Sequence, residues 1–174
     1  MPYTVRTMNA AAEAIAHLAG SGWVSAPAHR PRDEAIPRPL AGAPDGLVDW
    51  VSAFASLSAP DDAVWFLSLA DYGGQTDDAF AWNAFETLSL EVAATEREAA
   101  RVREFWSAHV PILLCVRGHY AYLAVRADGA VVYGEEPEFE ESTVVAESLA
   151  GFLASLGDES RDRHELVTRL VFGP

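Results

Sequence analysis

The sequence predicts an α+β fold, in which an antiparallel or mixed sheet is covered by helices within a single domain, residues 1–174. Its length of 174 residues is ordinary for one domain. Three successive apolar segments between residues 111 and 133 are typical of neighbouring antiparallel strands. Amphipathic helical patterns stand before and after these segments and do not alternate with them, so a parallel βαβ sheet is not expected.

The N-terminal region, residues 1–46, is expected to be a helix followed by an extended strap. Residues 9–19 are helix formers with Asn9 as the cap, and the glycines after them end the run. Residues 26–46 contain five prolines and three arginines. Because proline lacks the backbone N–H that helices and sheets use, this stretch is predicted to form neither.

The core is predicted to span residues 47–156 and to begin with a helix capped by Asp45. Apolar residues recur there at helical spacing, namely Leu47, Trp50, Val51, Phe54 and Leu57. The apolar run 64–69 fits either a strand or a helix, and a turn follows it. Residues 75–92 show no clean period and are interpreted as a loop leading into a short strand or helical turn.

A helix and a three-stranded meander follow. Thr95 and Glu98 form a capping box, which predicts a helix over 95–109. The expected strands cover residues 111–116, 119–126 and 131–133. Asp128–Gly129 supplies a tight turn between the last two, and the first is apolar on both faces, so it should be central.

Two helices are expected after the meander. The first carries a buried stripe made of Leu149, Phe152, Leu153 and Leu156. Gly157 is its natural end. Residues 157–174 are predicted to form a last helix that starts at Asp162, has Glu165 in capping-box position and docks back onto the body.

Charge is the strongest compositional signal. The chain has 26 acidic and 12 basic residues, a net charge of −14, and every basic residue is arginine. One explanation is solubility in a genome that favours Arg and Ala codons; the other is attraction to a basic partner. The charge argues against a nucleic-acid partner. Without an apolar run of about 20 residues or a secretory signal, no membrane span and a cytoplasmic location are expected.

Catalytic and metal-binding patterns are not visible in the sequence. The five histidines are scattered without ligand spacing, and no nucleophile or phosphate-binding motif is present. Cys115 stands in an apolar run, where a buried small hydrophobe is favoured over a reactive thiol. No cofactor, no metal and no catalytic residue are therefore expected.

Two polar clusters are candidate partner-binding residues. The first is the acidic segment, residues 135–141, which is either a solvated loop or an interaction surface with Phe139 as an apolar anchor. Its carboxylates are Glu135, Glu136, Glu138, Glu140 and Glu141. The second cluster begins at Asp71 and is either core packing of its aromatics or an aromatic and acidic contact surface. Its other members are Tyr72, Asp77, Asp78 and Trp82.

The stretch from Val110 to Leu156 resembles the distal half of the SUKH superfamily, which holds fungal cell-wall synthesis regulators and many bacterial immunity proteins. The shared pattern is a strand, a turn, a strand with aromatics, the Asp128–Gly129 hairpin, Val132–Tyr133, and a helix with Ser148-Leu-Ala-Gly-Phe152-Leu153. Upstream, residues 65–74 and 88–91 are similar to the family's aromatic-glycine turn and sheet-entry segment. The resemblance implies one α+β domain that binds another protein, often a toxin made by the same cell, and implies no catalysis.

These observations favour an immunity-type module that neutralises a cognate, basic toxin or effector through the acidic segment, as in toxin–antitoxin pairs. A regulatory or scaffold protein of cell-envelope assembly is the alternative that the same resemblance implies. An enzyme that uses carboxylates near Tyr72 and Trp82 on a small substrate is the third hypothesis.

Overall fold

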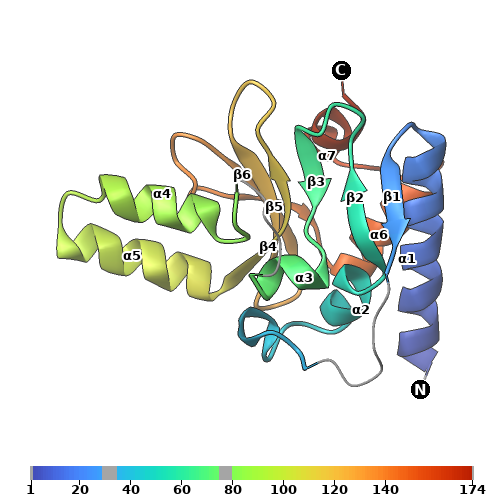
Figure 1. Ribbon diagram of the computed structural model, residues 1–174, viewed down its shortest axis with the longest axis horizontal. Helices are drawn as coiled ribbons and strands as arrows, with labels where there is room; N and C mark the ends of the chain where they lie inside the picture. The colour runs from blue at the N-terminus through green and yellow to red at the C-terminus, as the bar shows by residue number, and fades with distance from the viewer. Residues whose placement is uncertain (1, 29–34, 75–79, 174) are drawn as a thin grey trace.

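A seven-stranded antiparallel sheet lies at the centre of the computed structural model, which describes residues 2–28, 35–74 and 80–173 (Figure 1). Within these ranges every strand pairs with its neighbour in sequence. The strands are β1 (Val24–Pro27), β2 (Phe54–Ser58), β3 (Val64–Phe66), β4 (His109–Cys115), β5 (Ala121–Arg126), β6 (Val131–Glu135) and β7 (Thr143–Ala146). The α+β class is confirmed, and the sheet is antiparallel throughout rather than mixed.

Two pairs of helices lie on opposite sides of the sheet (Figure 1). α1 lies beside β1 and packs on α6, whereas α4 and α5 lie side by side and extend away from the sheet (Figure 1). The α-helices are α1 (Pro2–Gly20), α2 (Leu47–Val51), α3 (Leu69–Tyr72), α4 (Ala84–Val92), α5 (Glu96–Ser107), α6 (Leu149–Gly157) and α7 (Glu165–Val167). A 3-10 turn, η1 (Arg38–Leu40), and a π-helical turn, η2 (Thr168–Phe172), complete the described elements.

Both faces of the sheet are covered. Neighbouring residues of β3 point to opposite faces, so this strand contributes to both layers of packing. The Phe66 ring contacts Trp23 and Trp50, with centroids 5.5 and 5.1 Å away. On the opposite face, Trp65 of β3 is paired with Leu114, which is in turn paired with Tyr122. The ring of Tyr122 there contacts Trp106 of α5 and Phe139 of the acidic segment. In the described residues the buried apolar side chains form one continuous core.

The central meander confirms the sequence prediction. β4, β5 and β6 pair in order, and β4 is the fourth of the seven strands, with both faces buried except at Val110. The turn at Asp128 closes with the Arg126 N–H donating to the Ala130 carbonyl, and Gly129 has a φ of 92°. Glycine adopts this angle without strain, which explains why Asp-Gly is a strong turn signal.

The helix predicted after Asp45 is wrong beyond its first turns. The chain is helical only over Leu47–Val51, with Gly46 as the N-cap, and then forms β2. Phe54 and Leu57 are both buried, and their spacing of three positions also fits a helix. In the structure they belong to β2, which pairs with β1 on one side and β3 on the other. Tertiary pairing therefore overrides a periodicity that was ambiguous over so short a run.

Both ends of the sheet contain strands that the sequence did not predict. β1 ends at Pro27, inside the strap that was expected to form neither helix nor sheet. It is an edge strand, and an edge strand tolerates proline because backbone groups on its outer side have no partner strand. β7 lies between the acidic segment and α6. Near the C-terminus, helix α7 begins at Glu165 rather than Asp162, because the His164 ring, and not an acidic side chain, accepts from the Leu166 N–H.

Two further findings concern Cys115 and the lengths of the helices. Cys115 is buried at 3% exposure, as predicted, and burial raises the pKa of its thiol. Among the helices of the described ranges, none combines the length and hydrophobicity that a bilayer crossing requires.

Candidate functional site

The acidic segment joins β6 to β7 and is fastened to the body by Phe139. This ring is 6% exposed and stacks on Phe85 of α4, with centroids 4.7 Å apart and planes within 6°. The hydroxyl of Tyr122 donates to the Phe139 carbonyl at 2.5 Å. The alternative in which Phe139 anchors a partner is therefore corrected: its ring is buried, completes an aromatic cluster and holds the segment in place.

Three carboxylates of the acidic segment are engaged within the molecule. Glu135 accepts from the Tyr133 hydroxyl at 2.6 Å and lies 3.0 Å from His119 Nε2; the Tyr133 bond holds the pKa of Glu135 below its usual value. Glu136 accepts from the backbone N–H of Tyr120 at 2.8 Å. Glu140 accepts from the indole N–H of Trp106 on α5, also at 2.8 Å. These carboxylates hold the segment in one conformation.

Glu138 and Glu141 differ from those three. Both side chains are exposed, and within the described residues neither has a hydrogen-bonded or ion-paired partner. The Glu141 N–H donates to the Glu138 carbonyl at 2.9 Å, which fixes the backbone between them. The segment thus presents two available carboxylates on a rigid support.

A groove of about 430 Å³ separates the acidic segment from the α4–α5 hairpin. Its charged lining consists of Glu98, Glu138, Glu140, Glu141 and a single cation, Arg101. Its apolar lining consists of Val92, Ala93, Val102 and Pro137. The groove is therefore a concave surface whose lining combines apolar side chains with a predominantly negative charge.

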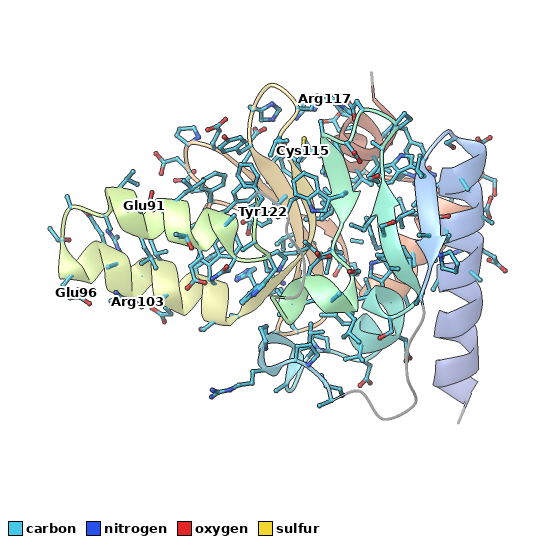
Figure 2. The ribbon with its side chains drawn as sticks, in the orientation of Figure 1. Glu91, Glu96, Arg103, Cys115, Arg117 and Tyr122 are labelled. Carbon is cyan, nitrogen blue, oxygen red and sulfur yellow. The ribbon has the colours of Figure 1, made fainter. Side chains whose placement is uncertain are left out.

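The hairpin adds further negative charge outside the groove. Figure 2 shows Glu91 and Glu96 toward the end of the hairpin that lies farthest from the sheet. Arg103 pairs with Glu96 at 2.9 Å. Partial burial raises the pKa of Glu86, and the charge of Glu140 raises it further while Arg103 opposes the shift. The carboxylates of α4 and of the acidic segment therefore share one electrostatic environment.

The second predicted cluster does not line this groove. Tyr72 is 3% exposed, its hydroxyl donates to the Pro111 carbonyl at 2.5 Å, and its ring lies 5.9 Å from that of the half-buried Trp82. Burial raises the pKa of Tyr72 well above its ordinary value. Asp71 caps α3 by accepting from the backbone of Ser68. Core packing explains these residues; Asp77 and Asp78 lie outside the described residues.

The described residues contain no group of three histidine, cysteine or carboxylate side chains placed to hold a metal ion. The lining of the groove offers charge and apolar surface. Comparisons with protein families, with curated proteins and with solved structures find no match to this chain.

Sequence reasoning missed the hairpin's share of the groove. Val92 was placed at the end of a loop leading into a short strand or helical turn, and Glu98 and Arg101 were placed on a helix, none of them with a role in binding. The short link of residues 93–95 places α4 and α5 side by side, but residues 84–92 lack the clear helical period that would have indicated α4 in the sequence. The contact between this hairpin and the acidic segment depends on tertiary packing at Phe139 and on the Trp106–Glu140 bond.

Proposed function

We propose that the protein is an immunity-type module that binds and neutralises a basic protein toxin or effector through the groove. The observation that carries this proposal is the composition of the groove's charged lining, which is four carboxylates and one arginine. When a basic surface docks there, its cations lose hydrating water and form charge-assisted hydrogen bonds with the carboxylates instead.

The whole-molecule charge supports the same function. A net charge of −14 attracts a cationic protein from a distance, and such steering raises association rates by roughly 10 to 1,000 fold. The rigid attachment of the acidic segment also favours binding, since a preorganised surface loses less conformational entropy when a partner docks.

The resemblance of residues 110–156 to the SUKH superfamily supports a toxin as the partner, and the α+β class agrees with that resemblance. On this proposal the protein acts in the cytoplasm of the bacterial cell that makes the toxin and catalyses no reaction itself. The proposed alternative, a scaffold of cell-envelope assembly, differs in having several weak partners.

The test is affinity capture of the partner from the source cell, followed by association kinetics. Replacing Glu138 and Glu141 by Arg should slow association about tenfold at about 50 mM salt, and the difference should shrink at about 500 mM salt. Glu91→Arg with Glu104→Arg is the matched control, because these exposed carboxylates change the net charge equally without lining the groove.

An association rate that changes neither with salt nor with the replacement of Glu138 and Glu141 would contradict the proposal. Capture of several weakly bound envelope proteins, with no tight basic partner, would favour the scaffold instead.

A further inference from the structure

We infer that the segment bound in the groove carries an apolar side chain flanked by arginine or lysine. This inference rests on the proposed function and names the chemistry of the partner segment. Carboxylates gathered on a surface do not by themselves define a ligand. The groove adds two features that do: an unusually exposed apolar side chain in its lining, and in the same lining a cation that has no ion pair within the described residues.

The apolar side chain is Val92, at the end of α4. It is 82% exposed, more than any other large hydrophobic residue of the described chain. Ala93, Val102 and Pro137 line the same groove. Apolar surface left in water at a concave site stabilises a complex when a partner covers it. We therefore place an aliphatic side chain of the partner against Val92.

The carboxylates around this apolar surface determine what flanks the aliphatic side chain. Glu138 and Glu141 are available, and docking removes them from water. Burying a carboxylate is unfavourable unless a donor replaces its hydration. Arginine and lysine supply charged donors, and arginine can bind a carboxylate through two N–H groups. The segment therefore carries cations next to its apolar residue.

Arg101 limits how the cations are arranged. It lies on α5 three residues after Glu98, lines the groove, and has no ion pair within the described residues. A cation of the bound segment placed against Arg101 is repelled. Arg101 thus acts as a specificity residue that weakens the binding of uniformly basic segments.

A second copy of this chain does not fit the groove as well. Each copy carries a net charge of −14, so bringing two grooves together opposes like charges. Anionic lipid and nucleic acid meet the same repulsion. A cationic protein segment is the occupant whose charge complements the site.

The experiment uses the full-length chain and two synthetic peptides, acetyl-Arg-Arg-Leu-Arg-Arg-amide and the same peptide with Ser in place of Leu. Binding is followed by ¹H–¹⁵N NMR. The indole N–H of Trp106 is a built-in reporter because it donates to Glu140 in the groove lining; Trp106→Phe assigns its signal.

The Leu peptide should shift the signals of Val92, Ala93 and the Trp106 indole, and should bind about fivefold more tightly than the Ser peptide. Val92→Ser should abolish that preference. Arg101→Glu should tighten both peptides about threefold, and more than the matched Arg97→Glu, which lies on α5 but does not line the groove.

Equal binding of the two peptides, or signal changes spread over the whole surface, would overturn the inference. That result would leave the proposed function standing if a captured basic partner still associates in a manner that depends on salt and on Glu138 and Glu141. Loss of that dependence, with the peptide preference intact, would instead count against the proposed function alone.

Discussion

The two helix pairs of this molecule have opposite properties. α1 and α6 pack against each other with buried residues such as Leu18, Phe152 and Leu153, and their backbones approach so closely that a Cβ on Gly157 would lie 3.1 Å from the Ala14 nitrogen. α4 and α5 project from the sheet and expose Val92 (Figure 1). The comparison teaches that the first pair is buried along its shared face, whereas the second pair leaves apolar surface exposed beyond the core.

The largest expected effect lies on the α1–α6 side. Phe152→Ala should lower the free energy of unfolding by about 3 to 5 kcal/mol, because it leaves a cavity at a side chain that is 1% exposed. Val92→Ala on the hairpin should change it by less than about 0.5 kcal/mol. Urea unfolding of both variants tests the contrast. Similar losses for the two would break it.

A smaller effect is expected where the acidic segment meets the sheet. A Cβ on Gly134 would overlap the ring of Tyr122, which is fully buried and has little room to move. Gly134→Ala should therefore lower the free energy of unfolding by about 1 to 3 kcal/mol and shift the Trp106 indole signal. Tyr122→Phe, which loses only the bond to the Phe139 carbonyl, should cost about 1 kcal/mol. Wild-type stability in Gly134→Ala would show that the ring is not confined.

The smallest effect concerns pH and the hairpin. The pKa of Glu86 is raised in the folded chain, mainly by burial, so its ionisation opposes folding as the pH rises above the ordinary value of 4.5. Glu86→Gln should be more stable than wild type at neutral pH, by less than about 1 kcal/mol, and equal to it below pH 4.5. Unfolding curves at several pH values measure this. A difference that does not change with pH would contradict it, and Glu104→Gln is the exposed control.

The elements that were predicted correctly have local causes. The β5–β6 hairpin depends on the Asp128–Gly129 turn, and α5 begins where the Thr95 side chain accepts from the Glu98 N–H. Each of these contacts spans only a few residues, so the sequence pattern contains the whole interaction.

The elements that were missed depend on distant residues. β2 became a strand because β1 and β3 flank it, although Phe54 and Leu57 also fit a helix. Phe139 is surrounded by charge in the sequence, yet it is buried because Phe85, more than fifty positions earlier, provides a stacking partner. The groove combines both kinds of element, and for this reason the sequence identified only the side formed by the acidic segment.

The order of the strands has a consequence for how the fold assembles. Since each strand pairs with the next one in sequence, most contacts within the sheet are local, and local contacts favour fast folding. The longest excursion between paired strands runs from Phe66 to His109 and contains the whole α4–α5 hairpin. Evolution can therefore reshape or exchange that excursion to match a new partner while the β-scaffold around it is retained.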